Sequence, residues 1–159
     1  MSLMGTLGLE NVEADPNAIP DGKYAGEVFK DEYVYVASKD EVSHVFTYRV
    51  TEGEHKGAQR TEWFLLGKNP QRDDNGNIVS LDVTMDDTKR RWYKKRFVDL
   101  GVPEAQVPNV KPGDQVGKKI NFGVKRNNGY INVNFVELRQ EAATPEAGTS
   151  GNAISSSMF

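Results

Sequence analysis

The 159-residue sequence contains no cysteine and only two histidines. The lack of cysteine excludes disulfides, thiolate metal sites and a cysteine nucleophile. Neither His44 nor His55 belongs to a metal-binding spacing such as His-Glu-x-x-His, and the glycine patterns of phosphate-binding loops and of the nucleophile elbow are missing. We therefore expect no catalytic residue, no bound metal and no cofactor, and the sequence does not predict an enzyme.

Apolar residues are also scarce. They make up 37% of the chain, whereas globular proteins contain roughly 45–50% when glycine is included, so we expect some segments to remain outside the folded core. No apolar run approaches the roughly 18 residues of a membrane-spanning helix, and the N-terminus lacks the pattern of a signal peptide. These absences predict a cytoplasmic protein without membrane contact.

Charge is distributed unevenly along the chain, whose formal net charge is only −3. Residues 1–87 carry 17 acidic and 8 basic side chains, whereas residues 88–140 carry 4 acidic and 12 basic ones. The block 88–97, TKRRWYKKRF, holds six cations and three aromatics without an acid. A positive region of this size indicates a polyanion partner. The alternative is that the acidic and basic parts pair with each other on folding.

Alternating apolar residues predict five strands, at 23–36, 43–51, 58–66, 119–125 and 130–138. The first strand is expected to bend at Gly26, and the second to be buried on one face only. Asn127-Asn-Gly129 predicts a tight turn between the last two strands. Residues 67–80 are rich in glycine, asparagine, proline and aspartate, which predicts a surface loop. The stretch 73–77 within it resembles part of a calcium loop, but the required glutamate is missing.

A helix is predicted over residues 85–100. Thr84 and Asp87 have the spacing of a capping box, and Gly101 followed by Pro103 marks the end. At 100° per residue, Tyr93, Phe97 and Leu100 share one face, which we expect to pack on the core. The flank of the helix carries Trp92 and Arg96. The opposite side carries four cations, Arg90, Arg91, Lys94 and Lys95.

Three strands, a helix and two strands is the element order of an OB-fold, a five-stranded Greek-key barrel with a helix between strands 3 and 4. We therefore expect a mainly β protein with a flexible arm over 1–21, an OB-fold domain over 22–140 and a disordered tail over 141–159. A small α+β roll and an SH3-like barrel with an inserted helix share most of these signals.

Single-stranded nucleic acid is a suitable partner for such a surface, because bases stack on aromatic rings and cations follow phosphates. Strand alternation directs Phe46, Tyr48, Ile120, Phe122, Val124, Ile131, Val133 and Phe135 inward, and Thr47, Arg49, Lys125, Tyr130, Asn132 and Asn134 outward. The predicted nucleic-acid-binding residues are Arg49, Trp63, Lys89, Arg90, Arg91, Trp92, Lys94, Lys95, Lys125, Arg126, Tyr130 and Asn132.

Several stretches resemble a family of small bacteriophage OB-fold proteins from replication and recombination regions. They are Ile19-Pro-Asp-Gly-Lys-Tyr24, Phe46-Thr-Tyr-Arg-Val-Thr-Glu-Gly-Glu-His-Lys-Gly57, Val98-Asp-Leu-Gly101 and Val116-Gly-Lys-Lys-Ile-Asn-Phe122. The resemblance covers residues 19–138 and implies binding of single-stranded DNA in phage replication or recombination, in the host cytoplasm. The ending Met158-Phe159 is similar to the protein-docking tail of bacterial single-strand-binding proteins, but Ser155-Ser-Ser157 replaces its acidic stretch.

The expected function is therefore binding of single-stranded DNA without sequence preference, and replication or recombination proteins are candidate partners of the tail. An oligomer is compatible with the sequence. The alternative is a protein-interaction module whose basic helix docks an acidic partner. A magnesium nuclease using Asp82, Asp86 and Asp87 is a third hypothesis, although acids at a helix start commonly complement its dipole.

Overall fold

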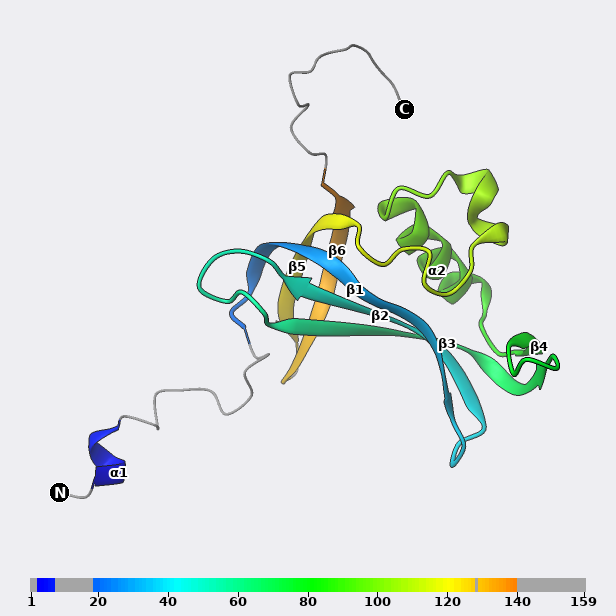
Figure 1. Cartoon of the computed structure of the whole chain (residues 1–159), viewed down its shortest axis with the longest axis horizontal. Helices are drawn as coiled ribbons and strands as arrows, with labels where there is room; N and C mark the ends of the chain where they lie inside the picture. The colour runs from blue at the N-terminus through cyan, green and yellow to red at the C-terminus, as the bar shows by residue number, and fades with distance from the viewer. Residues whose placement is uncertain (1–2, 8–18, 128, 140–159) are drawn as a thin grey trace, which may run out of the picture.

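The main element of the computed structural model is an antiparallel six-stranded sheet with the strand order β4-β3-β2-β1-β5-β6 (Figure 1). The structure describes residues 3–7, 19–127 and 129–139. Its elements are α1 Leu3–Thr6, β1 Gly22–Val36, β2 Glu41–Val50, β3 Gln59–Arg72, β4 Ile78–Val83, α2 Asp87–Asp99, the 3₁₀ helix η2 Glu104–Asn109, β5 Lys119–Asn127 and β6 Tyr130–Leu138. The protein is thus mainly β, as predicted, with a barrel-like curvature and six strands instead of five.

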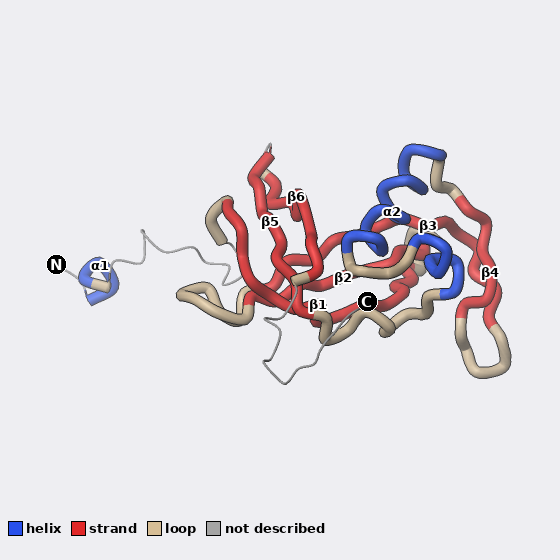
Figure 2. Tube along the Cα trace, turned by 90° about the horizontal axis from the view of Figure 1, so that it is seen from above, coloured by secondary structure: helices blue, strands red, loops and turns tan. Residues whose placement is uncertain are grey.

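The long strand β1 joins the two halves of the sheet. It pairs with β5 over Gly22–Glu27 and with β2 over Gly26–Val36, so Gly26 lies between two partner strands. A Cβ at Gly26 would lie 2.6 Å from the carbonyl oxygen of Arg49 and 2.7 Å from the ring of Phe122, which explains why only glycine fits. Figure 2 shows β5 and β6 standing at a steep angle to β2 and β3.

The core fills the concave side of the curved sheet and is closed by α2. It contains the inward residues predicted from β2, β5 and α2, and its buried members are Ile19, Val28, Phe46, Tyr48, Val50, Ala58, Phe97, Leu100, Val102, Ile120, Phe122, Val124 and Val136. Tyr93 packs against this cluster while partly exposed. The helical face predicted to pack inward is therefore confirmed.

The segment 67–80, predicted to be a loop, is mostly strand. β3 continues to Arg72, a turn follows, and β4 begins at Ile78. Only the stretch after Arg72 is a turn, in which the Asp73 carboxylate accepts hydrogen bonds of 2.9 Å from the amides of Asn75 and Asn77. Gly67 lies within β3. A Cβ there would lie 2.0 Å from the carbonyl oxygen of Asp82, so the close approach of β4 requires a glycine. The prediction failed because close packing, and not a turn, requires this glycine.

Strand β2 is buried on both faces, whereas the sequence predicted one. Its outward residues Ser43, Val45 and Thr47 are buried. They lie between β1 and β3, where Val45 is flanked by Glu32 and Trp63. Short side chains between longer ones are covered by their neighbours, so polarity alone does not reveal exposure here.

Helix α2 begins at Asp87 with Asp86 as its N-cap, two residues after the predicted start. The Asp86 carboxylate accepts a 2.8 Å hydrogen bond from the Lys89 amide, so the predicted capping box at Thr84 is wrong. The predicted end is confirmed: Gly101 has a φ of 89°, its amide donates to the carbonyl of Val98, and the next amide donates to that of Phe97. These are the hydrogen bonds of a Schellman motif.

The segments predicted as arm and tail lie largely outside the described residues. One helical turn, α1, lies within the predicted arm, and Ile19 at its far end is buried in the core. Residues 8–18 and the tail over 141–159 are not described. Within the described ranges, no helix combines the length and apolar character needed to cross a membrane.

Candidate nucleic-acid interface

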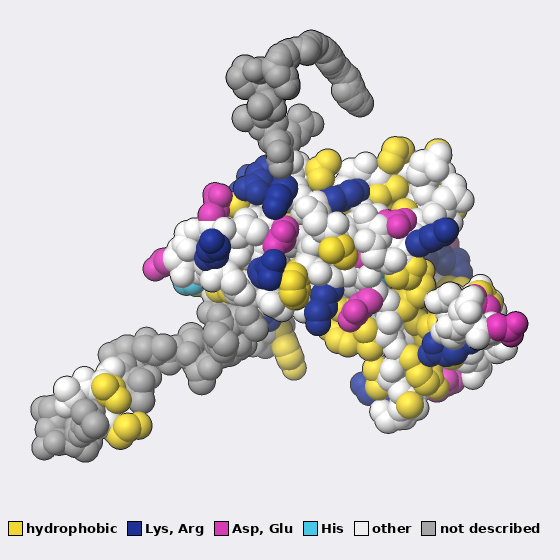
Figure 3. All heavy atoms as spheres, viewed as in Figure 1, with side chains coloured by type: hydrophobic (Ala, Val, Ile, Leu, Met, Phe, Trp, Pro, Cys, Tyr) yellow, Lys and Arg dark blue, Asp and Glu magenta, His cyan; other side chains and the backbone are white. Residues whose placement is uncertain are grey.

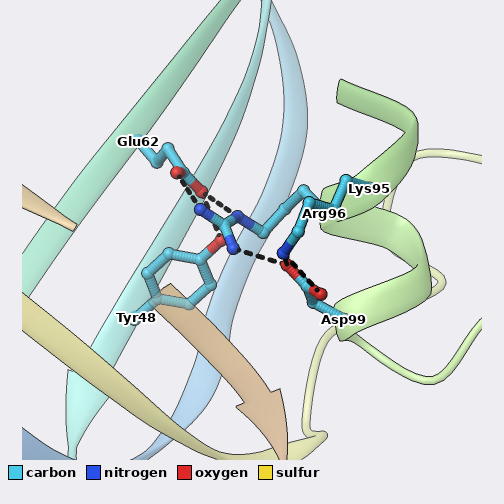
Figure 4. A network of polar contacts seen from close by, with 5 residues as sticks. All are labelled: Tyr48, Glu62, Lys95, Arg96 and Asp99. Carbon is cyan, nitrogen blue, oxygen red and sulfur yellow. Dashed lines mark hydrogen bonds and ion pairs between the residues drawn. The ribbon is translucent and has the colours of Figure 1, made fainter. Parts of the chain in front are cut away.

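A nearly buried arginine attaches α2 to the sheet (Figure 4). The guanidinium of Arg96 donates two hydrogen bonds to Glu62 of β3, with Nε 2.8 Å from Oε1 and Nη2 2.7 Å from Oε2. A third goes to Asp99 at 2.9 Å, and the Tyr48 hydroxyl donates to Glu62 at 2.7 Å. Lys95 completes the network from the solvent side through Asp99. The bidentate pairing of Arg96 with Glu62 fixes both the position and the rotation of α2.

The charges in this network compensate each other in a site with little water. Burial by itself lowers the pKa of Arg96, but the hydrogen bonds and charge of Glu62 outweigh it and raise the pKa. Burial, followed by the nearby Glu62 charge, raises the pKa of Tyr48 well above its usual value. Arg96 therefore remains a cation and Tyr48 a neutral donor. Arg96 is 8% exposed, so it positions the helix and is not available to a ligand.

A second buried network holds the other side of α2. The Asp31 carboxylate contacts Nε2 of His44 and accepts the Gln115 amide at 3.0 Å. Nδ1 of His44 lies 2.5 Å from the hydroxyl of Tyr93. Burial is the main cause that raises the pKa of Tyr93, so its hydroxyl stays protonated. His44 is thus a structural residue that links β1, β2 and α2.

Most cations of the 88–97 block have an acidic partner within the chain. Arg90 pairs with Asp87 at 3.4 Å, Lys94 with Glu104 at 3.0 Å and Lys95 with Asp99 at 3.0 Å, and Arg96 pairs with Glu62 and Asp99. Among the described residues, only Lys89 and Arg91 of the six have no acidic partner. Four of the six cations thus pair within the chain, as the alternative to a polyanion partner predicted.

The intramolecular ion pairs change the charge pattern of the surface. Figure 3 shows Lys and Arg side chains scattered over one face of the molecule with acidic side chains between them. Exposed pairs of this kind contribute about 0–1 kcal/mol each, since water and salt screen them. They are weak enough for a phosphate to replace the carboxylate.

Each tryptophan of the chain lies on an element that the Arg96–Glu62 ion pair joins, Trp63 on β3 and Trp92 on α2. Trp63 follows Glu62 in β3 and is 56% exposed; Trp92 precedes Arg96 by one helical turn and is 61% exposed. Residues four apart on a helix lie on the same side, so Trp92 lies toward β3. Lys89 lies one further turn along that side. Successive residues of a strand point to opposite faces, so Trp63 lies on the outer face of β3, beside Val45, and not on the face that α2 covers. We refer to Trp63 together with Lys89, Arg91 and Trp92 of α2 as the α2–β3 surface.

A second predicted group lies at the tip of the β5–β6 hairpin. Tyr130 is 73% exposed and shares the outer face with Lys125 and Asn132, which lie opposite each other. These residues face outward as predicted. Arg126 faces the other way, where its amide donates to Asp21 at 2.9 Å and its side chain approaches the Ile19 carbonyl.

Arg49 of β2 is engaged by the protein itself. It donates to Glu27 through Nη2 at 2.5 Å and Nε at 3.2 Å, and its guanidinium lies 4.2 Å from the ring centre of Phe29. Hydrogen bonding from Arg49, together with Lys119, lowers the pKa of Glu27. Arg49 therefore faces outward as predicted, but its charge is balanced.

The structure does not bring the twelve predicted residues together. Gly101, just after α2, packs against Leu138 at the end of β6, since a Cβ there would lie 2.6 Å from a Leu138 methyl. Tyr130 begins the same strand, eight residues away, which corresponds to about 27 Å. The α2–β3 surface and the hairpin tip are thus separate regions.

Two aromatic residues that face outward, Phe135 and Phe29, were not among the predicted binding residues. Phe135 was expected to face inward, but a β-bulge between Gly123 and Val124 places it opposite Gly123, whose missing side chain leaves room for the ring. Lys23 lies 5.8 Å from that ring centre. Phe29 occupies the bulge of β1. Strict alternation fails at both bulges, and Gly123 was the one signal in the sequence that indicated the first.

The three acids of the nuclease hypothesis have separate structural partners. Asp82 accepts from the Asn69 amide nitrogen at 2.8 Å, Asp86 caps α2 and Asp87 pairs with Arg90. Among residues 3–7, 19–127 and 129–139, no group of three or more histidine or acidic side chains could hold a metal ion.

A scan against protein-family models gave no match, and searches of curated proteins and of solved structures found no similar protein.

Proposed function

We propose that this protein binds single-stranded DNA with little sequence preference, through the α2–β3 surface. One observation carries the proposal: both tryptophans are more than half exposed, and they lie on the two elements that the Arg96–Glu62 ion pair joins. Exposed tryptophan is costly in water, whereas a base stacked on it contributes about 1–3 kcal/mol. Every base has a ring face, so stacking does not select a sequence.

Cations along α2 would supply the phosphate contacts. Lys89 and Arg91 are exposed and lack acidic partners among the described residues. Arg90, Lys94 and Lys95 form exposed ion pairs that a phosphate would replace at little cost. Contacts of this type release counterions, so binding must weaken as salt rises.

The same proposal extends to the fold and its role. We take the sheet as an OB-type barrel whose first strand pairs with β2 and β5, with β4 added as a sixth strand beyond β3. This topology and the stretches that resemble phage replication proteins support a role in phage DNA replication or recombination.

Tryptophan fluorescence during titration with oligo-dT tests the proposal. We expect quenching that weakens steeply between 50 and 200 mM salt, because about two or more phosphate contacts are lost to competing cations. The W63F and W92F variants should each lose part of the quenching and bind about tenfold more weakly, since phenylalanine stacks over a smaller area.

The K89A/R91A variant tests the phosphate contacts, and K39A/K56A, at two exposed turn positions, is its control with an equal change in charge. We expect the first to bind at least tenfold more weakly with a salt slope smaller by about 1.4, and the second to bind as the unmodified protein. Equal weakening in both variants, or no quenching at low salt, would contradict the proposal. Unaltered DNA binding with loss of an acidic protein partner would favour the interaction module.

A further inference from the structure

The outer face of the β5–β6 hairpin carries aromatic and polar side chains that the core does not use. Alternate residues of β5 from Ile120 to Val124 are buried in the core, so the residues between them point outward. Strand pairing places Gly123 opposite Phe135 and Lys125 opposite Asn132 on this outer face. Figures 1 and 2 both show the turn of the hairpin projecting away from α2. The outer face of the hairpin is therefore separate from the cations of α2.

The ring of Phe135 lies on the backbone of the neighbouring strand. A Cβ added to Gly123 would overlap both this ring and the side-chain oxygen of Asn134, so both side chains lie on the outer side of the sheet. Lys23 of β1 pairs with Gly123, and its Nζ lies over the Phe135 ring, 5.8 Å from the centre. The ring itself is partly exposed. An aromatic ring held on a sheet beside a cation is a position on which a nucleic-acid base stacks.

Tyr130 provides a second ring at the other end of the same face. It is 73% exposed and lies opposite Asn127 in the register of the hairpin. It is five residues from Phe135 in β6, which corresponds to about 17 Å. Asn132 and Asn134 are exposed between the two rings. Their amide groups both donate and accept hydrogen bonds, so they suit any base.

The cations of this face are available to phosphates. Lys125 is exposed and forms no ion pair with a described residue. Lys23 pairs with Glu137 at 2.9 Å, and both of these side chains are at least half exposed. Exposed pairs of this kind are weak because water and salt screen them. A phosphate next to a base on Phe135 would therefore replace Glu137 as the partner of Lys23.

Packing within the chain does not explain the whole face. An aromatic ring commonly covers a glycine of the next strand, which accounts for Phe135 alone. Tyr130 has most of its ring in water, where it covers no part of the core. A protein partner would require a continuous apolar centre, but asparagines occupy the space between the two rings. Separated rings with amides and cations between them suit a single nucleic-acid strand better.

We infer that the outer face of the β5–β6 hairpin is a second binding surface for single-stranded nucleic acid. Bases stack on Phe135 and Tyr130, and phosphates lie beside Lys23 and Lys125. The inference rests on the proposed function and extends it to a further part of the molecule. A strand that crosses about 17 Å at 3.4 Å or more per nucleotide contains at most about five nucleotides here. The hairpin thus adds affinity for long strands and binds short ones weakly.

Amide chemical shifts of the full chain during titration with a dT tetranucleotide test the inference. We expect shifts at Lys125 and over residues 130–135 in addition to those in α2. Shifts confined to α2 and β3 would overturn the hairpin surface and leave the proposed function intact. Shifts confined to the hairpin would support this surface and contradict the proposed one. No shift with the tetranucleotide in large excess would contradict both.

The Y130L/F135L variant removes both rings and keeps an apolar side chain over Gly123. Its affinity for a dT oligonucleotide of about 30 nucleotides should fall at least tenfold, because two stacking contacts are lost. Tryptophan quenching by the tetranucleotide should stay as in the unmodified protein, since α2 and β3 are unchanged.

The matched control is Y35L, which removes another exposed ring at the opposite end of β1. It should bind the long oligonucleotide as the unmodified protein does, and circular dichroism should be equal in all three proteins. Fluorescence anisotropy of the labelled oligonucleotide compares the affinities. Equal affinities of Y130L/F135L and Y35L would overturn the inference.

Discussion

At the residue scale, Glu27 illustrates how a surface contact affects stability. Its carboxylate accepts two hydrogen bonds from Arg49 and lies 3.7 Å from Lys119. Hydrogen bonding from Arg49 is the main cause that lowers its pKa. A carboxyl with a lower pKa in the folded state stabilises the fold above its unfolded-state pKa, near 4.5, and loses that contribution as the pH falls through the folded value.

The E27Q variant should therefore lower the free energy of unfolding by about 1 kcal/mol at pH 7, because it removes the carboxylate from two cations. The difference from the unmodified protein should shrink once the pH falls below about 4. Urea unfolding at pH 7 and pH 3.5 measures both effects. E32Q, at an exposed position of the same strand, is the control; a deficit independent of pH would contradict the assignment.

Individual residue directions could be predicted from the sequence wherever a strand is regular. Alternation gave the correct faces for Phe46, Tyr48 and Phe122 because the β2–β3 and β1–β5 ladders are regular at these residues. It failed at Phe135, since one extra residue at a bulge reverses every direction beyond it. A bulge depends on the partner strand, and a single sequence does not contain that information.

At the scale of elements, the ends of α2 separate local from tertiary signals. Gly101 and Pro103 marked its end correctly, because a left-handed residue is a local requirement. The start was misplaced because Thr84 and Asp86 are both good caps, and the amide of Thr84 is used instead by β3. Strand β4 was missed for a similar reason, since its turn-like neighbours Gly67 and Asn69 lie within β3.

The corrected cap leads to a test. D86A should lower the free energy of unfolding by about 1 kcal/mol, as it leaves the Lys89 amide without its acceptor. T84A should change it by less than about 0.5 kcal/mol, because the Thr84 hydroxyl is not the cap. Thermal unfolding of both variants decides between the two caps, and the reverse order of effects would restore the predicted one.

At the scale of the whole molecule, α2 is held by two buried networks, one at Arg96 and one at Tyr93. Each joins the helix to a strand far away in sequence: Arg96 contacts Glu62 in β3, and Tyr93 contacts His44 in β2. Helical spacing predicted correctly that Arg90, Arg91, Lys94 and Lys95 would face solvent. It did not reveal that Glu62 and Glu104 balance part of the basic block, or that Tyr130 lies far from Trp92, because both depend on strand pairing.

Removing the guanidinium should loosen the whole arrangement. R96A leaves the mostly buried Glu62 carboxylate without its cation, with only the hydrogen bond from Tyr48, and should cost about 3 kcal/mol in the free energy of unfolding. R91A, an exposed cation of the same helix, should cost less than about 0.5 kcal/mol. Denaturant unfolding compares them; equal small losses would mean that water replaces the ion pair and that α2 is not fixed by it.

The length of β1 also determines when the protein can fold during synthesis. Its first six residues, 22–27, pair with residues 119–124 of β5, so about a hundred intervening residues must leave the ribosome first. Until then Tyr48 lacks its ring contact with Phe122, and the core lacks the residues that β5 supplies. Because chains grow at about 5–20 residues per second, the apolar side of β2 remains uncovered for several seconds, and a chain ending before residue 119 should aggregate instead of folding.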